Sequence, residues 1–283
     1  MITCNLMGGL GNQLFQIFAT ISYAIKSKNQ FKFLNQQTLG GEGSTLRFTF
    51  WNTFLLRLKP FLIDSLPNLH IIREKDFTYK ELSIIDIISK DVMIVGYFQS
   101  YKYFKESYNT ICKIIGLKNM KNNLLYKLNY SNDFLKNTIS LHFRIGDYKN
   151  LQHFHPLMTK EYYNNALNYI KSKNNDTKFK ILYFCENDDI IDVEEKIKYL
   201  SNNFKDYEFI RGHSDLEDWE QLLLMSCCNH NIIANSSFSW WSAYFNDWEN
   251  KIVCYPSVWF GSSIHNNTKD LCPLEWVKIN IHD

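Results

Sequence analysis

The stretch TISLHFRIGDY, residues 138–148, changes from apolar to polar composition near His142. Residues 138–143 are apolar and β-branched, which predicts a strand, and the polar residues that follow predict a loop at its carboxyl end. The same change recurs along the second half of the chain. Further strands are predicted at 180–185, 207–210, 230–235 and 251–256.

Helical patterns separate these strands. Residues 160–172 carry apolar side chains on one face, a second helix follows the strand at 180–185, and a short helix starts near Phe238. Ser214 and Glu217 match a capping box, which predicts the start of another helix. Strands that alternate with helices predict a parallel sheet covered on both faces. In such sheets, ligands bind beyond the carboxyl ends of the strands.

The first half of the chain gives a weaker pattern. A strand at 1–6 runs into the glycine turn MGGLGNQ, and apolar residues at helical spacing follow it. Strands near 69–73 and 92–98 are also expected. The run from Leu14 to Ile25 is too short and too polar to span a bilayer, so we expect no membrane span.

Composition excludes several classes of protein. The chain has 283 residues, 45% of them hydrophobic, and a net charge of +2, which gives no reason to expect a nucleic-acid partner. Its seven cysteines form no C-x-x-C pair and are odd in number. This favours a reducing compartment, and hence the cytoplasm, over a disulfide framework or a zinc site. His153 and His155, without a third ligand, make a poor metal site.

The loops after the predicted strands gather polar groups. RIGDY, CENDD, RGHSD and NSSFS supply hydroxyls, arginine and acids at one edge of the sheet, which favours a phosphate-bearing ligand. Arg144 can grip phosphate oxygens with two N–H groups at once. The alternative is that Arg144 pairs with Asp147 and only staples the loop.

Two helix starts are candidate anion sites. The first helix N–H groups after the NSSFS stretch, with its hydroxyls, suit an anion, although Ser236 could be an ordinary N-cap. The glycine turn is either a tight strand-to-helix connection or a ligand contact made through Asn12 and Gln13. Trp240 and Trp241 are expected to pack behind the serine stretch.

Four stretches together resemble the alpha-1,2-fucosyltransferases of glycosyltransferase family 11. They are MGGLGNQLFQ (7–16), GYFQSYKYF (96–104), HFRIGDY (142–148) and LMSCCNHNIIANSSFSWWSAYFN (224–246). The resemblance implies an α/β protein with a GT-B fold, two Rossmann-like domains facing a cleft. We divide it into residues 1–136 on the acceptor side and 137–283, which would bind GDP-fucose.

The resemblance also implies inverting, metal-independent transfer of L-fucose from GDP-β-L-fucose to the 2-hydroxyl of a terminal β-galactoside, with no cofactor. The expected partners are GDP-fucose and a galactose-containing glycan, which would contact residues between 30 and 90. Another GDP-sugar transferase, such as an O-fucosyltransferase, and a non-catalytic glycan-binding protein are the alternatives.

One residue departs from the family's pattern: Ile145 stands where the family usually has a second arginine. The base for the acceptor hydroxyl is weak or absent, or else Asp147, His155 or Glu186. The expected catalytic residues are Arg144, Asp147 and Asn12; the donor-binding residues are Gly9, Gly11, Gln13, His142, Glu186, Asn235, Ser236, Ser237 and Phe238; His155 is the expected acceptor residue.

Overall fold

The chain folds into two units in the computed structural model, which describes residues 1–40, 45–83, 91–174 and 177–281. The first unit comprises Met1–Met120 and Asn266–Pro273, and the second comprises Lys121–His265 and Leu274–Asp283. The expected division at residue 136 differs from this one. Most of α3 (Leu117–Leu128) and all of α4 (Asn132–Lys136) fall in the second unit.

The second unit is built on a parallel six-stranded sheet of order β10-β9-β8-β11-β12-β13. Every strand expected from the second half of the sequence is present, and β13 adds one at the edge. The strand order reverses between β8 and β11, as in a doubly wound sheet. The strands are β8 (Thr138–His142), β9 (Lys180–Phe184), β10 (Glu208–Arg211), β11 (His230–Ile232), β12 (Val253–Pro256) and β13 (Val277–Ile279).

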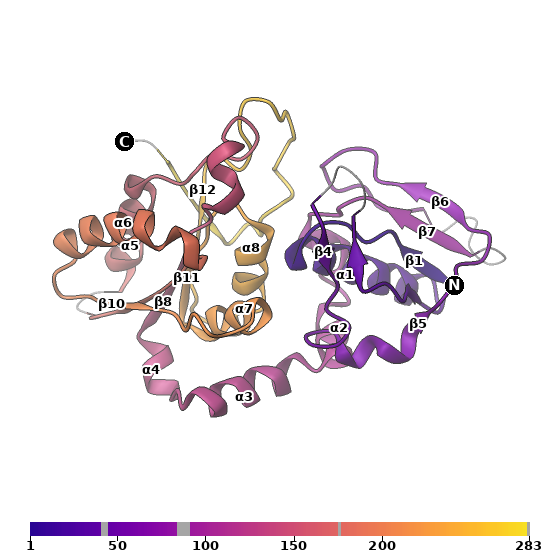
Figure 1. The fold of residues 1–283 in the computed structure, drawn as a ribbon, viewed down its shortest axis with the longest axis horizontal. Coiled ribbons are helices and arrows are strands. Elements are labelled where there is room, and N and C mark those ends of the chain that lie inside the picture. Colours follow the sequence, from indigo (N-terminus) through magenta and orange to yellow (C-terminus); the bar gives the residue numbers. More distant parts are fainter. Residues whose placement is uncertain (41–44, 84–90, 175–176, 282–283) are drawn as a thin grey trace. The chain divides into compact units, whose positions relative to one another are not determined.

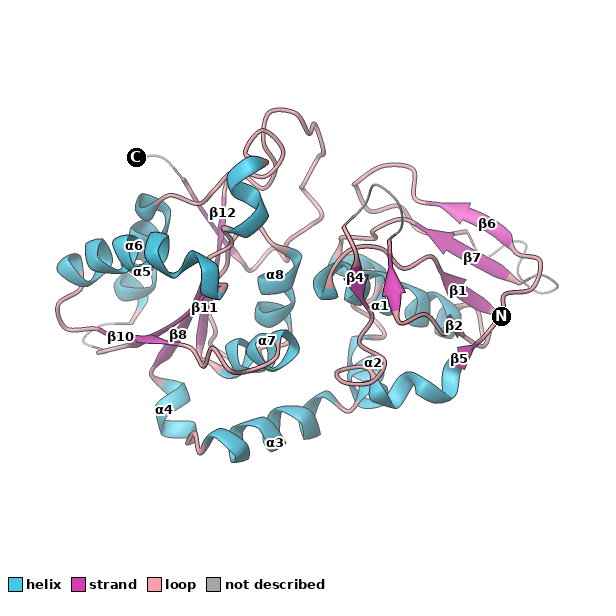
Figure 2. Cartoon of the chain, viewed as in Figure 1, coloured by secondary structure: helices cyan, strands magenta, loops and turns pink. Residues whose placement is uncertain are grey.

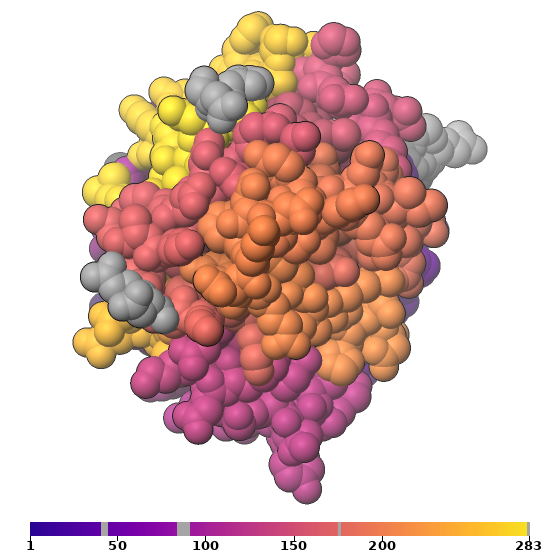
Figure 3. Space-filling model, turned by 90° about the vertical axis from the view of Figure 1, so that its left-hand side faces the viewer, coloured from indigo at the N-terminus to yellow at the C-terminus, as the bar shows by residue number. Residues whose placement is uncertain are grey.

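Helices cover both faces of this sheet, as predicted. In Figures 1 and 2, α5 (Lys160–Lys173) and α6 (Ile190–Asn203) lie on one side, and α7 (Asp218–Cys227) and α8 (Ser237–Tyr244) lie on the other. Figure 3 views the outer side of this unit, where the region around α6 (orange) and α3–α4 (magenta) form the surface.

The capping box of α7 lies one turn later than the sequence predicted. Glu217, not Ser214, is the N-cap. Its backbone N–H donates to the Glu220 carboxylate at 3.1 Å, and its own side chain accepts from the first turn of the helix. Two acids therefore satisfy each other's unpaired backbone donors, and their charge also suits the positive end of the helix.

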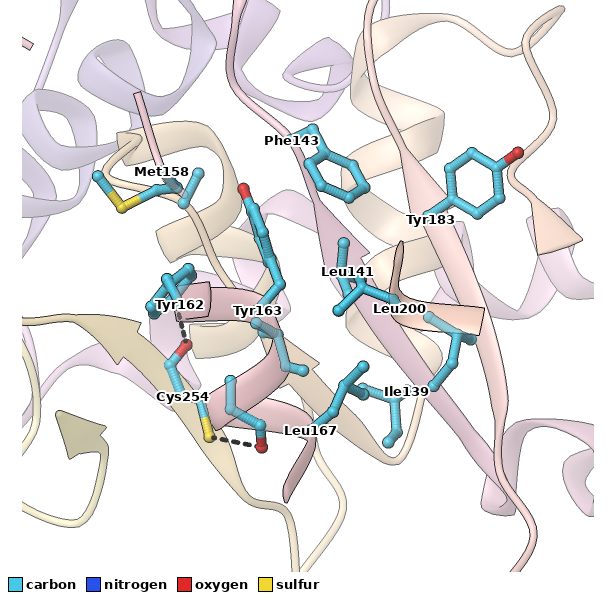
Figure 4. Close-up of a cluster of buried hydrophobic side chains, with 14 of the residues drawn as sticks. Ile139, Leu141, Phe143, Met158, Tyr162, Tyr163, Leu167, Tyr183, Leu200 and Cys254 are labelled. Atoms are coloured by element: carbon cyan, nitrogen blue, oxygen red, sulfur yellow. Dashed lines mark hydrogen bonds between the residues drawn. The ribbon is translucent and has the colours of Figure 1, made fainter. Parts of the chain in front are cut away.

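The core of the second unit lies between the sheet and α5. Figure 4 shows Ile139, Leu141 and Phe143 from the β8 segment packing towards Tyr163 and Leu167. The Tyr162 hydroxyl donates to the Ile233 carbonyl at 2.5 Å, so even the polar end of this buried ring is satisfied. This packing fixes the end of β8, from which the candidate site begins.

The first unit has a smaller parallel sheet of order β1-β7-β6. The connection from β1 (Ile2–Cys4) to α1 (Leu10–Lys26) is the predicted glycine turn, and the expected strands near 69–73 and 92–98 are β6 and β7. The other strands of this unit are β2 (Phe33–Leu34), β3 (Thr38–Leu39), β4 (Arg47–Phe48), β5 (Leu62–Ile63), β6 (His70–Arg73) and β7 (Val92–Val95), and its second helix is α2 (Tyr108–Ile115). Short 3₁₀ helices lie at Leu56–Phe61 and Tyr101–Tyr103 in this unit, and at Gly146–Asn150 and Asn187–Asp189 in the second unit.

The predicted α/β class is confirmed, because each unit pairs parallel strands with connecting helices. Two such units are the components of a GT-B fold. Residues 41–44 and 84–90, which belong to the span expected to contact the acceptor, lie outside the described residues.

Candidate active site

Two loops flank the point where the large sheet reverses its strand order. One follows β8 and the other follows β11, so both begin at the carboxyl edge. The Tyr148 hydroxyl joins them by donating to the Asn235 carbonyl at 3.2 Å. The crevice at such a reversal is where open α/β sheets bind ligands.

Arg144 is the cation of the first loop. Its Nη2 lies 2.6 Å from the Asp147 carboxylate, its Nη1 binds the Glu186 carboxylate, and its guanidinium lies 5.1 Å from the centroid of the Tyr148 ring. Burial disfavours the charged form, but the two carboxylates outweigh it and raise the pKa of Arg144 above its ordinary value. The pairing expected as the alternative reading is therefore present, and the guanidinium has further N–H donors beyond these two bonds.

The backbone of this loop is held by a buried carboxylate that the sequence analysis did not single out. Asp189, at the start of α6, accepts from the Gly146 N–H at 2.6 Å and from Lys149 Nζ at 3.1 Å. Ile145, directly before Gly146, is 5% exposed and belongs to the hydrophobic core. The position of the family's usual second arginine is therefore taken here by an apolar side chain that faces the interior.

Asn235 anchors the second loop. Its side chain is buried, and its Nδ2 donates to the Pro156 carbonyl at 3.0 Å and to the Trp259 carbonyl at 3.1 Å. The Asn235 Oδ1 has no hydrogen-bond partner among the described residues. Asn235 thus connects three loops at the carboxyl edge, and its Oδ1 remains an unpaired acceptor among the described residues.

The helix that follows begins without a side-chain cap. Ser236 is the N-cap of α8, but within the described part of the chain its hydroxyl makes no capping bond to the first turn. Ser237 and Phe238 are half-buried, and the first turn contains no acid. Backbone N–H groups and the positive end of the helix dipole are therefore available to an anion at this point.

The expected packing role of the tryptophans is confirmed. Trp240 and Trp241 are both fully buried, their ring centroids lie 5.2 Å apart, and Tyr244 stacks on Trp240 at 4.7 Å. Lys121 and Lys251 donate to backbone carbonyls at the carboxyl end of the same helix. Packing behind the helix and cations at its far end fix the position of its first turn.

His142 lies in the interior beside this turn. Its ring centroid is 5.5 Å from that of Phe238, and its Nδ1 has no partner within the described ranges. Burial, and to a lesser degree the charge of Arg144, lowers the pKa of His142 to about 3. The imidazole is therefore neutral at physiological pH and can offer either a donor or an acceptor.

His155, the expected acceptor residue, lies against the first loop. Its ring stacks on Tyr148 with centroids 4.7 Å apart and contacts Phe260 at 5.9 Å. Burial lowers the pKa of His155, Asp147 opposes this shift, and Arg144 adds to it. Arg144, Tyr148 and His155 therefore form one continuous column of side chains.

The glycine turn of the first unit is occupied by its own side chains. Gln13 is fully buried, and its Nε2 donates to the Gly8 carbonyl and to the Phe48 carbonyl, both at 2.9 Å. Asn12 Oδ1 accepts from Gln99 at 2.8 Å. Gly11 lies buried in the first turn of α1, while Gly9, the N-cap, has open space where a Cβ would be.

The structure thus brings most of the predicted site residues together in the second unit. Gly9, Gly11, Asn12 and Gln13 lie in the first unit, and the others line the carboxyl edge of the large sheet or the loops beside it. Tyr148 and Asp189 were missed. Tyr148 belongs to the motif HFRIGDY and Asp189 to the acidic loop CENDD, so both stretches were noticed, but a role that depends on cross-loop contacts has no local signal.

The described residues contain neither a membrane-spanning helix nor a metal-binding cluster. No helix in them is long and apolar enough to cross a membrane. No three histidine, cysteine, aspartate or glutamate side chains in the same ranges gather as a group that could hold a metal ion.

Comparison with known proteins gives consistent similarities. An alpha-1,2-colitosyltransferase of Escherichia coli is 29% identical over 299 residues, covering 99% of both chains. The O-antigen biosynthesis glycosyltransferase WbnK of Escherichia coli is 34% identical over 149 residues, covering 50% of this chain and 45% of its own. The crystal structure of a family 9 glycosyl transferase from Veillonella parvula covers 100% of this chain and 87% of its own, with 9% identity and a TM-score of 0.49.

The model of glycosyl transferase family 11 matches residues 1–280, nearly the whole chain. The match spans both units, and so includes the glycine turn, the Arg144 loop and the start of α8. The chain is therefore a glycosyltransferase that belongs to glycosyl transferase family 11.

Proposed function

We propose that this glycosyltransferase moves L-fucose from GDP-β-L-fucose to the 2-hydroxyl of a terminal β-galactoside, with inversion and without a metal ion. One observation supports the proposal above the others. Arg144 and the uncapped first turn of α8 flank the strand reversal of a doubly wound sheet, and Tyr148 joins their loops. A fixed cation and free backbone N–H groups suit a sugar diphosphate.

Direct displacement explains why these groups would be catalytic. As the bond from the anomeric carbon to the phosphate oxygen breaks, negative charge develops on the β-phosphate. Arg144 and the N–H groups of Ser237 and Phe238 are held in place before the reaction by packing and ion pairs. Donors that need no reorganisation stabilise the transition state more than the ground state, because the β-phosphate carries more negative charge as the bond breaks.

A second donor is supported by the relative that matches this chain end to end. Its name describes an alpha-1,2-colitosyltransferase. Colitose is L-fucose without the 3-hydroxyl group. A site that hydrogen-bonds this hydroxyl rejects the deoxy sugar by about 10⁴-fold or more, whereas a site without such a bond accepts both. GDP-colitose is therefore the second candidate donor.

The test is incubation of the purified full chain with GDP-L-fucose, GDP-colitose and other GDP-sugars, each with a panel of β-galactosides, followed by linkage analysis of the product. We expect an α1,2-linked fucosyl galactoside, with activity that survives EDTA. Transfer from GDP-colitose alone would show that colitose, and not fucose, is the sugar transferred. An activity that EDTA abolishes and a divalent cation restores would overturn the metal-free mechanism. Glycan binding without transfer from any donor would refute the whole proposal.

A further inference from the structure

We propose that His155 is the general base that removes the proton from the acceptor hydroxyl. This proposal rests on the proposed function, because it assigns a role in the same transfer reaction. It begins from the column Arg144–Tyr148–His155, in which the guanidinium lies over one ring and that ring stacks on the next. Inversion requires the attacking hydroxyl to approach the anomeric carbon from the face opposite the leaving phosphate, and the proposal places that hydroxyl at the His155 end of the column, with the phosphate at the Arg144 end.

The two carboxylates near this column are already engaged. Glu186 binds Nη1 of Arg144, and Asp147 binds Nη2 of the same guanidinium at 2.6 Å. Their oxygens hold the cation in position, and a proton taken by either one would weaken the ion pair that stabilises the leaving group. A base that also had to release Arg144 would work against the reaction it serves.

His155 has the properties that the other two lack. Its contacts are with the faces of Tyr148 and Phe260, and neither of its ring nitrogens has a hydrogen-bond partner in the described part of the chain. The ring is half-buried, so it has an accessible edge. Its lowered pKa keeps the imidazole neutral near pH 7, and a neutral imidazole can accept a proton.

The charged groups around His155 suit both protonation states. Burial and the charge of Arg144 lower the pKa of His155, and the charge of Asp147 opposes this shift and so favours the imidazolium. The Tyr148 hydroxyl, whose pKa is raised mainly by burial, stays protonated and does not compete for the proton. The environment therefore resists early protonation and still tolerates the product state.

The step balances without a further reactant. The acceptor oxygen forms a bond to the anomeric carbon while the bond from that carbon to the phosphate oxygen breaks, and its electron pair leaves with GDP. The hydroxyl proton moves to a ring nitrogen of His155, which later releases it to water. Because an oxocarbenium-like sugar needs little help from its nucleophile, proton removal contributes about 10²- to 10⁴-fold and not the whole rate enhancement.

The test compares His155→Gln and His155→Ala with His153→Gln, an exposed histidine two residues earlier in the same loop. For each full-length variant, kcat and kcat/KM of transfer are measured, with GDP-fucose affinity by calorimetry. We expect His155→Gln to lower kcat at least 10²-fold while donor affinity stays within about twofold. Imidazole in the buffer should partly restore His155→Ala, and His153→Gln should behave as wild type.

A pH profile provides the second readout. In the wild type, kcat/KM should fall on the acid side with an apparent pKa below 6.5, the ordinary value for histidine, because only the neutral ring is active. That acid limb should be absent in His155→Gln. A variant that keeps wild-type kcat, or that loses donor affinity in proportion to its rate, would overturn the role of His155.

The wild-type donor panel separates this inference from the proposed function. If the wild type uses a different GDP-sugar, the proposed donor is wrong, and the same variants measured with that sugar still decide the role of His155. If the wild type uses GDP-fucose and His155→Gln is unimpaired, the proposed function stands and the base assignment fails.

Discussion

The starts of helices α1 and α8 share the same local pattern but have different surroundings. Each follows a strand of a parallel sheet, and neither has a side-chain cap bond among the described residues or an acid in its first turn. At α1, Gln13 and Asn12 fill the turn with bonds to the Gly8 carbonyl and to Gln99. At α8, the serine turn stays open and buried tryptophans support it from behind.

This difference shows that the side chains around a helix N-terminus, and not the local sequence pattern alone, decide whether it is a candidate ligand site. At α1, the Gln13 amide ties the turn to two backbone carbonyls, so its first contribution is to stability. The turn at α8 is held in place by the buried Trp240 and Trp241 behind the helix, which leaves the backbone N–H groups of its first turn available to an anion. Five changes test this division, from the largest expected effect to the smallest.

Trp241→Ala should have the largest effect. Removing a fully buried indole from behind α8 leaves a cavity and should reduce the free energy of unfolding by about 3–5 kcal/mol, measured by urea denaturation. Leu274→Ala, which changes a side chain 89% exposed, is the control and should shift stability by less than about 0.5 kcal/mol. If Trp241→Ala kept wild-type stability and lost only donor binding, the tryptophan would belong to the site and not to its support.

Arg144→Ala should have the largest effect on chemistry. Loss of the cation that we propose faces the leaving group should lower kcat/KM by about 10²- to 10³-fold in a transfer assay with GDP-fucose. Arg144→Lys should recover only part of this, because an ammonium group cannot hold Asp147 and Glu186 with the same fork. Near-normal turnover in Arg144→Ala would contradict a donor site at Arg144 and the start of α8.

Gln13→Ala should act on stability. Its buried amide satisfies the Gly8 and Phe48 carbonyls, and leaving them without a donor should cost about 1–3 kcal/mol of unfolding free energy. We expect donor affinity, measured by calorimetry on the folded variant, to change by less than about threefold. A stable variant with strongly reduced donor affinity would show that the glycine turn is a ligand contact after all.

Acid should destabilise the second unit in particular. Burial lowers the pKa of His142 to about 3 and that of His230 to about 4, so the unfolded chain binds these protons first. Stability is therefore full above pH 6.5 and falls below it, by up to about 1.4 kcal/mol per pH unit for each histidine. Native-state hydrogen exchange should show this slope for α8 and not for α1. His230→Gln should flatten the slope, and an unchanged slope would rule out His230 as a source.

Ser236→Ala should have the smallest effect. An N-cap serine that bonds the first turn contributes about 0.5–2 kcal/mol, and the Ser236 hydroxyl makes no such bond in the described residues. We expect the free energy of unfolding, measured by thermal denaturation, to change by less than about 0.5 kcal/mol. Any weakening should appear in the affinity for the donor. A loss of 1 kcal/mol or more would mean that the Ser236 hydroxyl does cap α8 and that the first turn is not open to an anion.

The strands and helices of the second unit were predictable because their patterns are local. Apolar runs of strand length alternate with helical spacing, and all the predicted strands form. The capping box was misplaced because Ser214 and Glu217 match the usual Ser/Thr–Glu spacing, whereas the observed pair, Glu217 and Glu220, has an acid at the N-cap. Geometry, not composition, chose the later pair.

The candidate site divides in the same way. Arg144, Asp147 and the serine turn were visible because charged and hydroxyl side chains follow predicted strands. Tyr148 and Asp189 act across loops that are distant in sequence, through Asn235 and Gly146, so no spacing rule finds them.

The sequence by itself determined the α/β class, the loops at the carboxyl edge and the family, because periodicity and motif order are properties of the linear chain. Only the tertiary structure decided which of the polar groups are used up and which remain available. Gln13 Nε2 donates to two backbone carbonyls and Ile145 packs into the core, while the Ser236 hydroxyl makes no cap bond among the described residues. Hydrogen-bond satisfaction and burial depend on neighbours far away in the sequence, and packing alone brings those neighbours together.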